Sequence, residues 1–217
     1  MSQEIIKKMQ QSIREYDADA AISAAREVLE ANLDIPGAIE EGFATVIREI
    51  GNKFEQMEVF LPELVMAADA MKAGVEVLEK SIAGTGVQIK HKGVVVIGTV
   101  EGDIHDIGKT VVAAMLQANG FVVHDLGVEV PSPSFIQKAK DVNADIIALS
   151  ALLSTTMLYQ RDVIELLRNK GQRDKYKVMV GGAPVTQKWA DEIGADFYAR
   201  DAIEAVRVLE KVYGGAV

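Results

Sequence analysis

The chain contains no cysteine, and this absence removes several classes of site at once. A disulfide framework, a thiolate metal site and a cysteine nucleophile are all excluded. Basic residues are also in the minority, with 23 lysines and arginines against 32 aspartates and glutamates, for a formal net charge of -9. Because nucleic acids and anionic membranes attract clustered Lys and Arg, we expect no nucleic-acid partner.

Long apolar runs are missing as well. No stretch approaches the roughly 18 apolar residues that a membrane-spanning helix needs. The first residues, MSQEIIKKMQQSIREYD, are charged throughout and lack the apolar segment of a signal peptide. We therefore expect no membrane association and a cytoplasmic location. The 217 residues are 49% hydrophobic, which is enough to bury the core of one large or two small domains.

Residues 1–85 show only helical periodicity. The clearest apolar stripe has members three or four residues apart, as expected for a helix packed along one side: Leu61, Leu64, Val65, Ala68, Met71, Val75, Leu78 and Ile82. Three earlier segments behave likewise, so we expect a four-helix bundle. Pro36 and Pro62 suit the first turns of the third and fourth helices, and Asp17 or Asp19 could cap the second.

The segment Gly84-Thr85-Gly86 interrupts the helical periodicity and predicts a domain boundary. We expect a helical domain over residues 1–85, a linker over 86–91 and a second domain over 92–217. The glycine-containing segment at 84–86 is the candidate hinge between them.

The second domain alternates apolar strands with helices. The predicted strands are GVVVIGT, FVVHDLG, ADIIALS, YKVMVGG and ADFYA, each followed by a helical pattern, the last of which runs to Tyr213. Such alternation predicts a doubly wound, parallel five-stranded α/β sheet, because each crossover helix must cover one of its faces. Ligands of these sheets bind beyond the carboxyl ends of the strands.

The loop after the first predicted strand carries the densest cluster of functional side chains, with His105 among the carboxylates of Glu101, Asp103 and Asp106. It ends in Gly108-Lys109-Thr110, like a phosphate-binding loop. That motif also requires a glycine where this chain has Asp103, and its neighbouring carboxylates would repel phosphate. Nucleotide hydrolysis is therefore disfavoured. We expect Asp106 to cap the following helix and Lys109 to be solvated.

Two further sites of α/β proteins lack essential residues here. A phosphotransfer receiver domain needs an aspartate at the end of its third strand, where this chain has Ser150. A zinc or magnesium site needs several ligands, but the other two histidines are His91 and His124, which we expect to be surface or packing residues.

A single histidine held by a carboxylate suits a metal whose other positions are filled by a macrocycle, as in a corrin or haem, because the carboxylate fixes the tautomer of the ring. Gly108 would let the backbone pass close to a bulky cofactor. The small residues of SALLST and of Gly181-Gly182-Ala183 offer a narrow slot between strands, which a nucleotide tail would fit.

The pattern Asp103-x-His105-x-x-Gly108, followed by Ser150-x-Leu152 and then Gly181-Gly182, resembles the base-off, histidine-on cobalamin-binding family in order and spacing. The first domain, including EVFLPEL from Glu58, resembles the helical cap of its methyltransferase-type members. The chain is thus similar to the corrinoid proteins of methylamine, methanol, betaine and aryl-ether methyltransferase systems, and to the cap and B12-binding domains of cobalamin-dependent methionine synthase. The resemblance implies a flavodoxin-like (Rossmann-like) sheet.

The same resemblance assigns roles to individual residues. His105 would be the lower axial ligand of cobalt, and Asp103 would accept a hydrogen bond from it. Thr156 would extend this hydrogen-bonded relay, although we would expect Ser at that position. The cofactor-binding residues implied are Asp103, His105, Asp106, Ile107, Gly108, Ser150, Leu152, Ser154, Gly181, Gly182 and Ala183. From the cap, Phe60 and Leu61 would shield the upper face of cobalt.

The function implied is that of a methyl carrier with a cobalamin or related corrinoid cofactor. Cobalt(I) would accept a methyl group through a donor-specific methyltransferase, and a second methyltransferase would pass it to tetrahydrofolate or a thiol. A reductive activation protein is a further implied partner, and the chain is not expected to turn over alone. The alternative is the cobalamin-binding subunit of an adenosylcobalamin-dependent mutase. Such subunits usually lack a helical cap, so residues 1–85 count against it.

Overall fold

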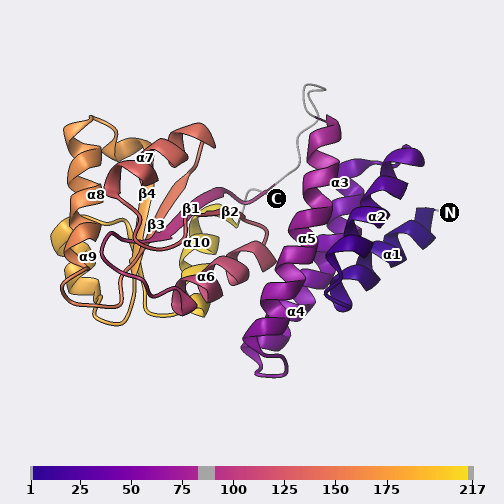
Figure 1. The fold of residues 1–217 in the computed structure, drawn as a ribbon, viewed down its shortest axis with the longest axis horizontal. Coiled ribbons are helices and arrows are strands. Elements are labelled where there is room, and N and C mark those ends of the chain that lie inside the picture. The colour runs from indigo at the N-terminus through magenta and orange to yellow at the C-terminus, as the bar shows by residue number, and fades with distance from the viewer. Residues whose placement is uncertain (1, 83–90, 215–217) are drawn as a thin grey trace. The chain divides into compact units, whose positions relative to one another are not determined.

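The computed structural model describes residues 2–82 and 91–214, and the chain falls into two compact units, residues 1–90 and 91–217 (Figure 1). The first is helical and the second is an α/β unit. The predicted hinge at residues 84–86 and all but residue 91 of the predicted linker lie outside the described residues. Within the described ranges, no helix is both long and apolar enough to cross a membrane.

The helical unit confirms the predicted helical domain. It comprises α1 (Ser2–Arg14), α2 (Ala18–Glu30), a third helical segment that runs from Ile35 to Glu55, and α5 (Leu61–Ile82). Asp17 caps α2, because its side chain accepts a hydrogen bond of 2.9 Å from the backbone N–H of Ala20. Pro36 and Pro62 lie in the first turns of α3 and α5, where proline leaves no helical hydrogen bond unmade.

The third segment is not a uniform α-helix. It consists of α3 (Ile35–Ala38), a π-helical stretch over Ile39–Ala44 and α4 (Thr45–Glu55). Gly42 faces Met9 of α1 so closely that an added Cβ would lie 2.7 Å from the Met9 sulfur. The side chains of Gln10 and Thr45 donate hydrogen bonds of 2.9 Å to the carbonyls of Glu41 and Glu40. These donors satisfy carbonyls of the wider π turn.

The α/β unit confirms the predicted sheet. Its strands are β1 (Val94–Thr99), β2 (Val122–Asp125), β3 (Ile146–Ser150), β4 (Lys177–Gly181) and β5 (Phe197–Ala199). All pair in parallel, in the order β2-β1-β3-β4-β5. β1, β3 and β4 are buried along most of their length, as expected for central strands covered on both faces.

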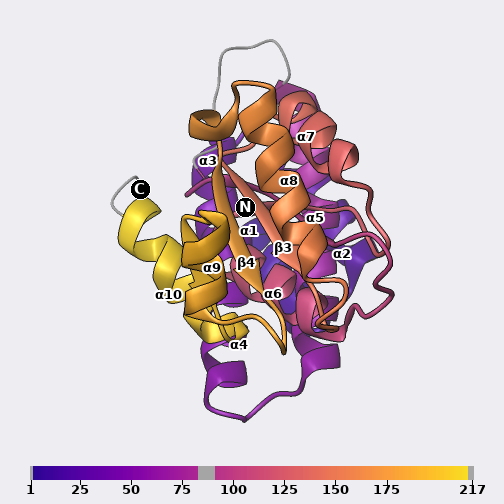
Figure 2. The same ribbon diagram turned by 90° about the vertical axis from the view of Figure 1, so that its left-hand side faces the viewer.

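Helices cover both faces of this sheet (Figures 1 and 2). α6 (Ile107–Ala118) and α10 (Ala202–Tyr213) pack against each other on one face. On the other face lie α7 (Ser132–Asp141), α8 (Leu158–Asn169) and α9 (Gln187–Ile193), and their apolar residues share one core cluster with those of the strands. A short 3-10 turn, Arg173–Lys175, precedes β4.

The strand order changes direction between β1 and β3, which are neighbours although β2 lies between them in sequence. Their carboxyl ends are level, because Thr99 pairs with Ser150. The loops that leave these two strands turn toward opposite faces of the sheet and leave a crevice between them, the usual ligand position in such folds.

Candidate functional site

The loop after β1 is anchored by its backbone to the neighbouring strand ends. Val100 forms a β-bridge with Val130, and its N–H donates to the carbonyl of Ser150 at 3.0 Å. The Thr99 hydroxyl donates to the carbonyl of His105 at 2.8 Å, which closes the loop on itself. His105 is therefore held at the β1–β3 edge by strand and loop contacts alike.

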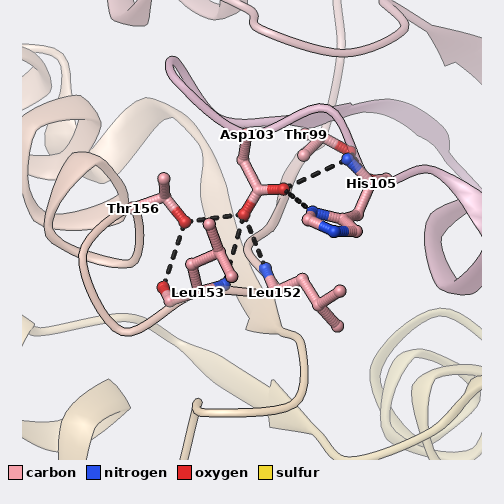
Figure 3. Close-up of polar contacts among 6 residues, drawn as sticks. All are labelled: Thr99, Asp103, His105, Leu152, Leu153 and Thr156. Carbon is pink, nitrogen blue, oxygen red and sulfur yellow. Dashed lines mark hydrogen bonds and ion pairs between the residues drawn. The ribbon is translucent and has the colours of Figure 1, made fainter.

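The side chain of Asp103 connects this loop to the loop after β3 (Figure 3). Asp103 is completely buried. Its Oδ1 accepts hydrogen bonds from Nδ1 of His105 at 2.7 Å and from the His105 backbone at 3.1 Å. Its Oδ2 accepts from the Thr156 hydroxyl at 2.6 Å and from the backbone N–H groups of Leu152 and Leu153 at 2.7 and 3.3 Å. The carboxylate thus fixes both loops relative to each other.

These donors also set the charge of Asp103. Burial alone raises the pKa of this carboxyl, but the hydrogen bonds from Thr156, His105 and Leu152 together outweigh burial and hold the pKa well below its ordinary range. Asp103 is therefore ionised at neutral pH and can only accept hydrogen bonds. A neutral His105 must then carry its proton on Nδ1, which leaves the lone pair on Nε2 available as a metal ligand. The His105 side chain is 46% exposed, so an incoming group can reach it.

A cavity of about 400 Å³ opens beside His105 at the carboxyl ends of β3 and β4, on the face of the sheet that α6 and α10 cover. Of the residues predicted to bind a cofactor, the lining includes His105, Gly108, Ser150, Leu152, Gly181, Gly182 and Ala183. Chain segments far apart in sequence therefore meet around one space.

Two glycines of the lining have different reasons to be glycine. Gly182 has a φ of +123°, and an added Cβ would lie 1.8 Å from the carbonyl oxygen of Ala151, so only glycine fits. Gly108 lies in the first turn of α6, and an added Cβ would meet no atom of the described residues within 4 Å. Packing within the described part of the chain does not require glycine at this position, which lines the cavity.

Comparison with known proteins adds an independent result. Two family models, each described as a B12 binding domain, match the chain over residues 93–207 and 5–79. The chain belongs to the B12-binding family. The first match covers more than half of the chain and includes the whole Asp103–Gly108 loop, both loops at the β3 and β4 ends and the cavity lining.

Relatives of this B12-binding protein include the dimethylamine corrinoid protein 2 of Methanosarcina acetivorans, 51% identical over 98% of both chains, and the trimethylamine corrinoid protein 1 of the same organism, 47% identical over 97% of both. Among solved structures, the methanol:cobalamin methyltransferase complex of Methanosarcina barkeri matches with a TM-score of 0.84 and 29% identity, over 98% of this chain and 80% of that one. The predicted resemblance to corrinoid proteins is confirmed.

Not every residue predicted for the B12 site lines the cavity. Asp106, Ile107 and Ser154 are exposed and lie outside its lining. Phe60 and Leu61 belong to the helical unit, where Phe60 is 75% exposed and Leu61 half-buried. The roles expected of these residues toward the cofactor remain predictions.

Two expectations about polar residues near the B12 site are wrong. Asp106 occupies the N-cap position of α6, but its side chain makes no capping hydrogen bond. Lys109 is buried rather than solvated, and its amino group forms an ion pair with Asp125 at the end of β2. The sequence offers no local signal for this pair, because the two residues meet only when α6 packs on the sheet.

Exposed apolar side chains lie around His105, and two of them, Ile104 and Leu153, were not predicted from the sequence. Ile104 and Ile107 flank His105 in sequence and are 67% and 73% exposed, while Leu152 and Leu153, which bond to Asp103 through their backbones, are 42% and 43% exposed. Clustered exposed apolar side chains mark a binding surface. Their position predicts contact with a broad apolar ligand. In the described ranges, no group of three or more candidate metal-binding side chains occurs.

Proposed function

We propose that this chain is the methyl-carrying corrinoid protein of a methylamine methyltransferase system, with His105 as the lower axial ligand of cobalt. One observation carries the proposal. His105 lies at the mouth of the cavity, with Nδ1 bound to the buried carboxylate of Asp103 and Nε2 free to act as a ligand. A structural histidine would need neither an adjoining cavity nor an apolar surface around it.

The residues at the site fit a base-off corrinoid. A corrin is broad and largely apolar, as are the exposed side chains of Ile104, Ile107 and Leu152 beside His105. A nucleotide tail is long and narrow, and the cavity offers backbone and small side chains along its walls, including Ser150, Gly181 and Ala183. Gly108 leaves open the space through which such a tail enters.

The chain's own contribution is ligation, orientation and proton placement. A bound corrinoid supplies the cobalt that carries the methyl group. Asp103 holds the imidazole of His105 in one tautomer and one orientation, and Thr156 in turn holds the carboxylate through its hydroxyl. This hydrogen-bonded relay places a proton on Nδ1. It allows the proton to be shared with the carboxylate when the electron donation required of Nε2 changes. The hydroxyl of Ser150 and the side chain of Leu152 would contact the benzimidazole base of the cofactor, which His105 would replace beneath cobalt.

Partner enzymes are part of this proposal. The relatives named for dimethylamine and trimethylamine, and the methanol:cobalamin methyltransferase complex, favour a donor-specific methyltransferase as the first partner. We further propose a second methyltransferase, which passes the methyl group to tetrahydrofolate or a thiol, and a reductive activation protein. Phe60 and Leu61 of the helical unit are the candidates for shielding the upper face of cobalt.

The test of the methyl-carrier function uses the full chain loaded with hydroxocobalamin and reduced with titanium(III) citrate. Dimethylamine and a dimethylamine-specific methyltransferase are added, and the visible spectrum reports methylation of the bound cofactor. We expect methylation only when the amine and its methyltransferase are both present. The same experiment is repeated with trimethylamine and a trimethylamine-specific methyltransferase. A loaded protein that accepts no methyl group from either system would overturn the proposal.

A further inference from the structure

Gln160 of α8 is a fully buried amide that none of the motifs described above includes. Its Nε2 donates to the carbonyl oxygens of Leu149 and Gly181, at 3.0 Å each. Its Oε1 accepts from Nε1 of Trp189 in α9 at 3.0 Å. The side chain therefore uses both of its N–H groups and its oxygen inside the protein.

The orientation of this amide is fixed by its partners. A carbonyl oxygen only accepts hydrogen bonds and the indole N–H of Trp189 only donates, so the opposite orientation of the amide would set like groups against each other. Trp189 is itself held in place. The guanidinium of Arg161 lies 4.7 Å from the centre of the indole ring and forms an ion pair with Glu192 at 2.9 Å.

The two carbonyls that Gln160 binds are at the ends of the strands that border the cavity. Leu149 and Gly181 both contribute to the lining, and each is followed directly by another lining residue, Ser150 and Gly182. The strand ends are close together at this point, because the N–H of Ala151 donates to the carbonyl of Gly181 at 3.2 Å. The missing Cβ of Gly182 allows the same close approach.

Gln160 acts from the face of the sheet opposite the cavity. α8 and α9 lie on one face (Figure 2), whereas Val111 and Val112 of α6 and Ala202 and Ala205 of α10 line the cavity on the other. Gln160 thus contacts the backbone of the slot without contacting anything inside it. Gln160 is therefore not part of the cavity lining, although it binds the backbone of two residues that are.

We infer that Gln160 is a positioning residue that sets the width of the slot for the nucleotide tail, by tying the ends of β3 and β4 to Trp189. The inference rests on the proposed function, because it takes the cavity to be the site of that tail. It predicts that Gln160 discriminates between corrinoids with and without a tail.

The experiment compares the affinity of the full-length apoprotein for cobalamin and for cobinamide, which lacks the nucleotide tail, in wild type and in Gln160→Met. Methionine keeps the length of the side chain but removes all three hydrogen bonds. We expect the preference for cobalamin over cobinamide to fall about tenfold in Gln160→Met, the factor that corresponds to about 1.4 kcal/mol. Trp189→Phe, which removes the donor to Oε1 but leaves both hydrogen bonds from Nε2 of Gln160 available, should shift the preference in the same direction by less.

The matched control is Ile164→Val, which removes one methyl group from a buried residue of the same helix without touching the amide. It should lower the thermal stability but leave the ratio of the two affinities unchanged. If Gln160→Met or Trp189→Phe loses affinity for both corrinoids equally, Gln160 serves only stability and the inference is wrong. If wild type binds cobalamin no more tightly than cobinamide, the assignment of the cavity as the tail site fails instead.

Discussion

Asp103 binds Nδ1 of His105 with one carboxylate oxygen and, with the other, three donors from the loop after β3. One buried side chain thereby fixes the tautomer of a candidate cobalt ligand and joins the two loops of the β1–β3 crevice. The position of His105 thus depends on the folding of residues some fifty positions away in sequence.

Asp103→Asn tests this dual role in the apoprotein. An amide replaces one accepting oxygen with a donor, so at least one of the N–H or O–H groups around Asp103 loses its partner. We expect the free energy of unfolding at pH 7 to fall by about 2 kcal/mol in urea denaturation. Asp106→Asn is the control, because that side chain is exposed and makes no capping bond. Equal stabilities of the two variants would contradict the role given to Asp103.

The Thr156 hydroxyl should affect how stability depends on pH. The pKa of Asp103 is lower in the folded chain than in the unfolded one, so its contribution is present above the ordinary carboxyl range and is lost as the pH falls through the folded pKa. Thr156→Val removes a donor and raises the folded pKa toward its ordinary value. The stability deficit of Thr156→Val should therefore be about 1.5 kcal/mol at pH 7 and should shrink only as the pH falls below the folded pKa of Asp103 in the valine variant.

Thr156→Ser is the control for this pH dependence, since it keeps the hydroxyl and removes only the methyl group. Urea titrations of the three proteins at pH 7 and at a series of falling acidic pH values give the measurement. A valine variant whose deficit stays constant throughout the acidic series would show that Thr156 does not act through the charge of Asp103.

Gly108→Ala should separate folding from binding. Alanine favours a helix over glycine, and its Cβ at this position enters open space, so the apoprotein should gain up to about 1 kcal/mol in stability. Gly108 lines the cavity, so the same methyl group should weaken cobalamin binding about tenfold, measured by titration of the visible spectrum. Gly182→Ala should instead destabilise the apoprotein, because its Cβ would collide with Ala151. A Gly108→Ala protein that binds cobalamin as wild type does would place the cofactor elsewhere.

Local sequence patterns predicted most of the fold. All five strands and the helices between them follow from apolar runs and periodicity, because each element must bury an apolar face. The π-helical stretch at Ile39–Ala44 did not follow, and within it Gly42 packs closely against Met9 of another helix. Spacing of apolar residues within one segment carries no information about such a contact.

The site divides in the same way. His105, Asp103 and the glycines at 108, 181 and 182 could be predicted from the sequence, because the proposed ligand chemistry calls for particular residue types close to strand ends. The burial of Lys109 beside Asp125 and the hydrogen bond between Gln160 and Trp189 could not be predicted, because these partners belong to different elements and meet only in the folded unit. Asp106 shows the converse error, since a suitable residue at an N-cap position need not form the capping bond.

The most direct test of the account is the visible spectrum of the full chain reconstituted with hydroxocobalamin, recorded for wild type and for His105→Ala under oxidising conditions. If Nε2 of His105 is the lower axial ligand, both proteins bind cobalamin but differ clearly in the bands that report axial ligation. Identical spectra of the two bound proteins, or a wild-type protein that binds no cobalamin, would contradict the central claim.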